Sequence, residues 1–168
     1  MTICTKDREN LFGEIVEGEM KLNDVGEIVK AAWEWIGTQY PNVELDEWVV
    51  MPNHLHGVLV IHEDCSVSED CDRQDDCRGG SRTAPTTHVS SVNKIRKPLG
   101  RLVGAFKTVS TKHVNRLRNT PGALLWQRNY YEHVIRNEAD LVRIRNYISE
   151  NPVAWEEDEE LRTKLLAL

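Results

Sequence analysis

Two histidines one residue apart are the first candidates for chemistry in the sequence. His54 and His56 lie at the start of a run, Leu55–Ile61, that is otherwise apolar or glycine, and Pro52 and Asn53 form a turn before it. This pattern is typical of a strand with at least one buried face. Strand side chains alternate between faces, so the two imidazoles point the same way, about 7 Å apart along the strand. They could share a metal ion, or they could be half-buried and simply hydrogen-bonded.

A tyrosine and an asparagine near the C-terminus could complete such a site. Tyr147 and Asn151 are four residues apart, which places them one turn apart on the same side of a helix. If this helix crosses the histidine strand, a phenol and a carboxamide oxygen face the two imidazoles. Taken separately, each residue has a simpler interpretation. Tyr147 could pack as an amphipathic residue at a helix edge, and Asn151 could be a helix C-terminal residue.

Together these residue types suit the cleavage of a phosphodiester. Its negative oxygens repel a nucleophile, so the reaction needs a cation and a positioned oxygen that attacks in line. Two neutral histidines and one oxygen ligand leave coordination positions open for phosphate oxygens and water, which suits Mg²⁺ or Mn²⁺, whereas a structural zinc site would be closed. A nearby metal also favours the ionised, nucleophilic form of a tyrosine. Attack by Tyr147 would form a phosphotyrosyl ester, which keeps the strand joinable.

The elements that must position these residues follow the order strand, helix, strand, strand, helix, strand, helix. They are expected as a strand at 2–5 with a hairpin at 11–20, a helix from Asp24 to about Gly37, strands at 43–51 and 55–61, a helix from Pro98 to about Leu117, a strand-like run at 124–135 and a helix from Asn137. The last helix should end at Asn151–Pro152, because the residue before a proline is disfavoured in a helix, and a short acidic helix follows. This order predicts an α+β sandwich with an antiparallel sheet of about four strands and helices on one face.

Composition indicates one globular domain. The chain has 168 residues, of which 40% are apolar and 29% charged. It contains no apolar stretch of membrane-spanning length and no signal-peptide pattern, so we expect a cytoplasmic protein with no membrane partner. Residues 63–93 lack periodicity and are rich in Asp, Ser, Gly, Thr and Pro, which predicts a disordered insertion. Its three cysteines, Cys65, Cys71 and Cys77, lack the close spacing of a zinc site.

Charge is distributed unevenly along the chain. The net charge of −6 argues against broad affinity for nucleic acid, but no acidic residue occurs from His88 to Tyr131. This segment is a candidate DNA-binding surface, although a solvated basic helix face is an equally simple interpretation. The basic residues in question are Lys94, Arg96, Lys97, Arg101, Lys107, Lys112, Arg116, Arg118 and Arg128.

Three runs carry a resemblance to a known family. WVVMPNHLHG (48–57), WQRNYYEHVIR (126–136) and YISENP (147–152) resemble, in this order, the REP-associated tyrosine transposases of the single-tyrosine HUH transposase family. The resemblance implies one ferredoxin-like (RRM-like) HUH endonuclease domain over residues 1–168, which nicks and rejoins single-stranded DNA at hairpin-forming repeats through a 5′-phosphotyrosine. It implies His54 and His56 as metal ligands and Tyr147 as the nucleophile. It also implies Asn151 as the third metal ligand, with Glu150 as the weaker candidate.

The sequence is therefore consistent with three functions. The first is a metal-dependent transposase that binds single-stranded or hairpin DNA, acting as a homodimer because two DNA ends meet one tyrosine per chain. The second is a catalytically inactive or domesticated hairpin-binding protein. It is favoured by the start of this sequence almost inside the first strand, where family members usually carry an aromatic pair that reads DNA. The third is a zinc-binding module that uses His54, His56 and the cysteines.

Overall fold

The computed structural model describes residues 1–62 and 99–166, with side chains described up to Trp155. The predicted insertion at 63–93 lies outside these described residues, as do its cysteines and three of the predicted DNA-binding residues, Lys94, Arg96 and Lys97. Within the described part of the chain, no helix is long and apolar enough to cross a membrane.

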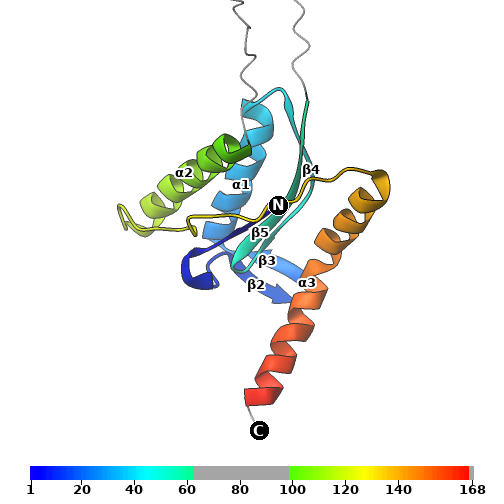
Figure 1. The fold of residues 1–168 in the computed structure, drawn as a ribbon. Coiled ribbons are helices and arrows are strands. Elements are labelled where there is room, and N and C mark those ends of the chain that lie inside the picture. Colours follow the sequence, from blue (N-terminus) through cyan, green and yellow to red (C-terminus); the bar gives the residue numbers. More distant parts are fainter. Residues whose placement is uncertain (63–98, 167–168) are drawn as a thin grey trace, which may run out of the picture.

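A three-stranded antiparallel sheet forms the centre of the fold (Figure 1). Its order is β1 (Thr2–Cys4), β5 (His54–Ile61) and β4 (Val43–Met51). A tight turn at residues 52–53 joins β4 to β5. The histidine strand is therefore the central strand of the sheet, and its backbone is hydrogen-bonded on both sides.

The strand predicted at 124–135 is present as an extended segment along the outer edge of β1. Two isolated bridges tie it there, between Thr2 and Tyr131 and between Thr5 and Trp126. Between these bridges the chain leaves the ladder. The Lys107 ammonium accounts for this departure, because it donates to the backbone carbonyls of residues 127, 128 and 129 at 2.7, 3.3 and 3.0 Å. The segment therefore occupies the place of a fourth strand without forming one.

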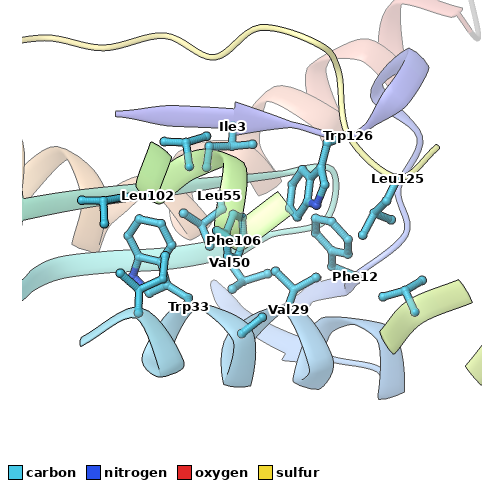
Figure 2. Packing of buried hydrophobic residues seen from close by; sticks show 14 of the residues in the cluster. Ile3, Phe12, Val29, Trp33, Val50, Leu55, Leu102, Phe106, Leu125 and Trp126 are labelled. Carbon is cyan, nitrogen blue, oxygen red and sulfur yellow. The ribbon is translucent and has the colours of Figure 1, made fainter. Parts of the chain in front are cut away.

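Two helices, α1 (Asp24–Gln39) and α2 (Leu99–Arg118), cover one face of the sheet. Helix α1 begins where it was predicted, and the side chain of Asn23 caps it by accepting from two backbone amides at 3.0 Å each. Aromatic rings fill the space beneath the sheet, with Trp33 and Phe106 in an edge-to-face contact at 5.3 Å. The buried cluster includes Ile3, Val29, Trp33, Val50, Leu55, Leu102, Phe106 and Trp126 (Figure 2).

A third helix, α3 (Glu138–Leu166), lies on the opposite face of the sheet (Figure 1). The predicted end at Asn151–Pro152 is wrong, because α3 continues through the proline. Pro152 cannot donate a backbone hydrogen bond, which costs about 3 kcal/mol in a helix interior. Packing offsets this cost: Pro152 is buried, Trp155 lies against His54, and Val153 lies beside Gly18 of the hairpin β2 (Gly13–Val16) and β3 (Glu19–Leu22). The α+β sandwich with an antiparallel sheet is confirmed. The prediction that the helices lie on one face holds for α1 and α2 but not for α3, whose Tyr147 and Trp155 lie against the histidines on the other face.

The contact between Gly57 of β5 and Trp33 of α1 provides a test of this packing. A Cβ atom added to Gly57 would lie 2.6 Å from the ring of Trp33, which is fully buried. We expect Gly57→Ala to lower the free energy of unfolding by about 1–3 kcal/mol, because the indole has no room to move. Gly104→Ala on α2 is the control: its Cβ meets nothing within 4 Å, so stability should stay equal or rise by up to about 1 kcal/mol. Urea denaturation measures both, and equal stability of Gly57→Ala and the wild type would contradict this packing.

Candidate active site

The two histidines form a buried pair on the α3 face of β5. Each is 8% exposed, and their Nε2 atoms lie 2.9 Å apart. The ring centroids are 4.5 Å apart and the planes are nearly perpendicular, at 83°. Leu55, the residue between them, points the other way into the apolar core. The alternation of β5 thus separates the polar site from the core with one layer of backbone.

Each imidazole is oriented by a second hydrogen bond at Nδ1. His54 Nδ1 lies 2.8 Å from Oδ1 of Asn53, and His56 Nδ1 lies 2.9 Å from Oγ1 of Thr2. The orientation of the Asn53 amide follows from its other contact, since its Nδ2 donates to the carbonyl of Arg8 at 3.1 Å. Oδ1 therefore faces the ring, and because this oxygen can only accept, His54 carries its proton on Nδ1.

Burial keeps both imidazoles neutral at pH 7. It lowers the pKa of His54 from 6.5 to about 4, with a smaller contribution from the positive charge of Arg8. It lowers the pKa of His56 from 6.5 to about 3, helped by the charges of His54 and of the N-terminal amino group. A neutral imidazole keeps one unprotonated ring nitrogen, which is the form that binds a metal ion.

Three residues of α3, at intervals of four along the helix, lie over the histidine pair. The ring of Tyr147 lies 5.4 Å from that of His56, and the ring of Trp155 lies 5.4 Å from that of His54. Asn151 is one turn from each, so its side chain lies between these two contacts and is 8% exposed. Tyr147 is 56% exposed and is therefore accessible to a large substrate.

The other predicted ligands differ in their surroundings. Glu150 is exposed, in contrast to its buried neighbour Asn151. Cys4 pairs in register with His54, yet the described residues contain no group of three or more His, Cys, Asp or Glu side chains that could hold a metal ion. A site with a third protein ligand in this part of the chain therefore needs a different type of donor, and the Asn151 carboxamide is the buried candidate.

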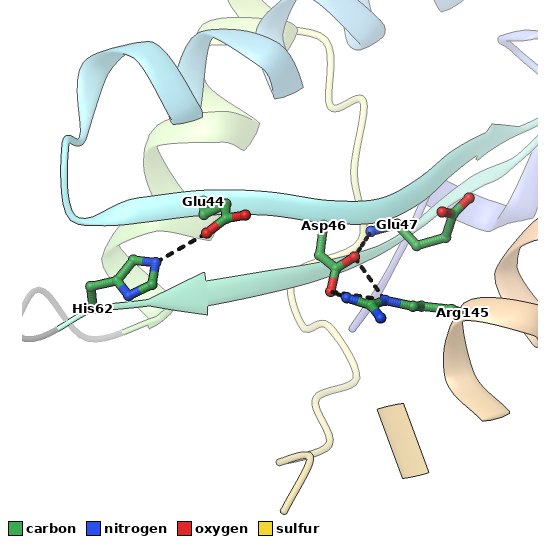
Figure 3. Close-up of polar contacts among 5 residues, drawn as sticks. All are labelled: Glu44, Asp46, Glu47, His62 and Arg145. Carbon is green, nitrogen blue, oxygen red and sulfur yellow. Dashed lines mark hydrogen bonds and ion pairs between the residues drawn. The ribbon is translucent and has the colours of Figure 1, made fainter. Parts of the chain in front are cut away.

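An ion pair attaches α3 to the sheet near the tyrosine. Arg145 Nε donates to both carboxylate oxygens of Asp46 at 3.0 and 3.2 Å, and its Nη2 donates to Oδ2 at 2.9 Å (Figure 3). These hydrogen bonds lower the pKa of the Asp46 carboxyl group and keep it ionised. Because Arg145 is two residues from Tyr147, the pair fixes the height and rotation of the helix where the phenol is presented.

A bulge in β4 lies beside the Asp46 carboxylate. The register against β5 shifts between Leu45 and Trp48, so Asp46 and Glu47 together oppose Val58, which shares the histidine face of β5. Asp46 follows Leu45 in the regular alternation and therefore faces α3. The extra residue places Trp48 on the core side again, the same side as Leu45.

The predicted DNA-binding residues that the structure describes lie mainly on α2, on the other side of the sheet from the histidines. Lys107 is engaged by three backbone carbonyls, and these use all three N–H groups of its ammonium. A surface cavity of about 430 Å³ opens between α2 and residues 124–128 and is lined in part by Lys112 and Arg128. The exposed members of the predicted set are Arg101, Lys112, Arg116, Arg118 and Arg128.

Four residues of this site were not predicted: Thr2, Arg8, Asn53 and Trp155. Asn53 could have been found, because it directly precedes His54 at the turn that starts the strand. Thr2 and Arg8 depend on how β1 and the one-turn 3₁₀ helix at Lys6–Arg8 are placed, which their local sequence does not reveal. Trp155 was hidden by the expected end of α3 at the proline.

Comparison with known proteins adds a family and a fold. No model of a known protein family matches the chain. An uncharacterized protein of Haemophilus influenzae is 39% identical to it over 163 residues, which cover 95% of this chain and 82% of that protein.

Among solved structures, a REP-associated tyrosine transposase bound to a REP hairpin has a similar fold, with a TM-score of 0.54 and 22% sequence identity. The match covers 91% of this chain and 64% of the transposase chain, so this chain spans less than two thirds of that protein. At this identity the likeness establishes the fold. The chain therefore belongs to the same family as the uncharacterized Haemophilus influenzae protein, and it has the α+β fold of the tyrosine transposase.

Proposed function

We propose that this protein is a metal-dependent enzyme that nicks and rejoins single-stranded DNA at hairpins through a phosphotyrosine intermediate. The observation that carries the proposal is a buried pair of neutral histidines 5.4 Å from the ring of an exposed tyrosine, His56 to Tyr147. The similarity of the fold to a tyrosine transposase bound to a REP hairpin supports the same class of substrate.

The donor set fits a divalent cation that keeps open coordination positions. Two neutral imidazole nitrogens, of His54 and His56, and one carboxamide oxygen would leave room for phosphate oxygens and water, which suits Mg²⁺ or Mn²⁺, whereas a structural zinc site would be closed. The carboxamide oxygen of Asn151 would be the third ligand. A cation bound there would neutralise the phosphate oxygens and polarise the phosphorus for attack.

In this reaction Tyr147 supplies the nucleophile. Its phenol oxygen attacks the phosphorus, the bond from phosphorus to the 3′ oxygen breaks, and the 5′-phosphate remains on the tyrosine. The phenol proton is lost and the departing 3′ oxygen takes one up, so a free 3′-hydroxyl is released. The docking of α3 on Asp46 through Arg145 keeps the phenol in position, because a helix free to rotate would lose this alignment.

In this proposal the DNA contacts both faces of the sheet, because the basic residues of α2 and the tyrosine of α3 lie on opposite faces. We expect the hairpin to contact the exposed basic residues of α2 and Arg128, with the single strand passing around the β1 edge toward Tyr147. The segment at 124–135 runs along this edge from the end of α2 to the start of α3. Arg8, whose charge acts on His54, would meet a phosphate close to the cleavage point.

Removing one histidine should separate cutting from binding. We expect His54→Ala to abolish metal-dependent nicking of a labelled hairpin oligonucleotide, while its affinity for the hairpin stays within about threefold, because phosphate contacts elsewhere supply most of the binding. His62→Ala is the control, since His62 is an exposed histidine just past the far end of β5, where it pairs with Glu44 (Figure 3). Normal cutting by His54→Ala would contradict the proposal, and binding without nicking by the wild type would indicate a hairpin-binding protein instead.

The low pKa values of the histidines predict that metal binding depends little on pH between 8.0 and 6.0. With pKa values of about 4 and 3, both rings stay neutral down to pH 6.0, so the Mn²⁺ dissociation constant should change less than about threefold between pH 8.0 and 6.0. Two histidines with the ordinary pKa near 6.5 would both be neutral in about 6% of molecules at pH 6.0, weakening binding roughly fifteenfold. Isothermal titration calorimetry at the two pH values distinguishes these cases, and a fifteenfold loss would show that the rings are solvated.

A further inference from the structure

The hydrogen bonds of the histidine pair define where each proton lies. A neutral imidazole carries one proton, and that of His54 lies on Nδ1, which faces the Asn53 carbonyl oxygen. Nε2 of His54 is therefore an acceptor, so Nε2 of His56 must donate across the 2.9 Å contact. His56 Nδ1 is then unprotonated, and the Thr2 hydroxyl donates to it at 2.9 Å.

In this arrangement only one of the two rings has an unprotonated Nε2 that could bind a metal ion. His54 already offers an unprotonated Nε2 toward the site. His56 does not, because its Nε2 carries a proton that points at the other ring. For His56 to bind a cation through Nε2, that proton must leave and Nδ1 must gain one, with no net change in charge. The atom opposite Nδ1 must then accept a hydrogen bond where it donated one before.

The two orienting side chains differ in whether they permit this exchange. The Asn53 oxygen can only accept, and its amide is held by the Arg8 carbonyl, so it keeps His54 in a single tautomer. A hydroxyl can donate or accept by rotating about its C–O bond, so Thr2 can serve either tautomer of His56. Its position is secure, because Thr2 pairs with His56 in the register of β1 and exchanges two backbone hydrogen bonds with Tyr131.

We propose that Thr2 is a positioning residue that lets His56 change from the hydrogen-bonded partner of His54 into a metal ligand. The inference rests on the proposed metal site. In the exchange, the Nε2 proton of His56 passes to solvent, Nδ1 takes a proton from solvent, and the Thr2 hydroxyl turns to accept from it. Without the hydroxyl, the ligating tautomer would bury an N–H group with no partner, so metal binding would be opposed.

Three variants test this role. Thr2→Val keeps the β-branched shape but removes the hydroxyl, and Thr2→Ser keeps the hydroxyl. Thr38→Val is the control for hydroxyl loss, since Thr38 lies on α1 and bonds only the local carbonyl of Trp35 among the described residues. By calorimetry, we expect Thr2→Val to raise the Mn²⁺ dissociation constant 10–100-fold, the usual cost of losing an orienting partner, and the other two to stay near the wild type.

Nitrogen-15 NMR of the histidine rings reports which ring nitrogen carries the proton. If Thr2 only stabilised the fold, Thr2→Val would not change this position. In metal-free wild type we expect His54 protonated on Nδ1 and His56 on Nε2, and saturating Mg²⁺ should move the His56 proton to Nδ1. Thr2→Val should keep the Nε2 form at the same Mg²⁺ concentration. Wild-type affinity for Mn²⁺ in Thr2→Val, or His56 protonated on Nδ1 before metal is added, would overturn the role of Thr2. Absence of Mn²⁺ binding by the wild type would overturn the metal site itself, and with it this role.

Discussion

The alternation of side chains along β5 is the constraint on which the rest of the structure depends. Leu55 and Gly57 face α1 and α2, where Gly57 lets the ring of Trp33 approach the backbone. His54 and His56 face the opposite way and meet across 2.9 Å. Because β5 is central in the sheet, neither face can shift without disturbing the other. One strand thus anchors the apolar core and holds the two imidazole rings in a hydrogen-bonded pair on its other face.

The second half of the site comes from α3, which lies on the histidine face of the sheet with Ile148 and Asn151 buried. Three features hold it: the ion pair between Asp46 and Arg145, the contact of Trp155 with His54, and the continuation of the helix through Pro152. They lie on either side of Asn151 and Tyr147 along the helix. A polar ion pair and an aromatic contact therefore position these two residues, while Tyr147 stays exposed to a substrate.

Features with a local signal could be predicted from the sequence. The hairpin, the histidine strand, the start of α1 and the clustering of basic residues on α2 follow from turn residues, periodicity and composition. Features set by distant contacts could not. The path of α3 through Pro152 depends on Trp155 meeting His54, and the irregular course of residues 124–135 depends on Lys107 binding three carbonyls. The bulge at Asp46 and the pairing of Thr2 with His56 depend on strand register, which the residues of either strand alone do not encode.

The site of covalent attachment tests most directly the proposed role of Tyr147 as the nucleophile. Wild-type protein incubated with Mg²⁺ and a hairpin oligonucleotide should form an adduct that survives denaturing electrophoresis, and mass spectrometry of its peptides should place the DNA 5′-phosphate on Tyr147. Tyr147→Phe should form no adduct although its ring still packs on His56, whereas Tyr131→Phe, a change at another exposed tyrosine, should react normally. An adduct on Tyr130 or Tyr131, or one that persists in Tyr147→Phe, would contradict this role of Tyr147.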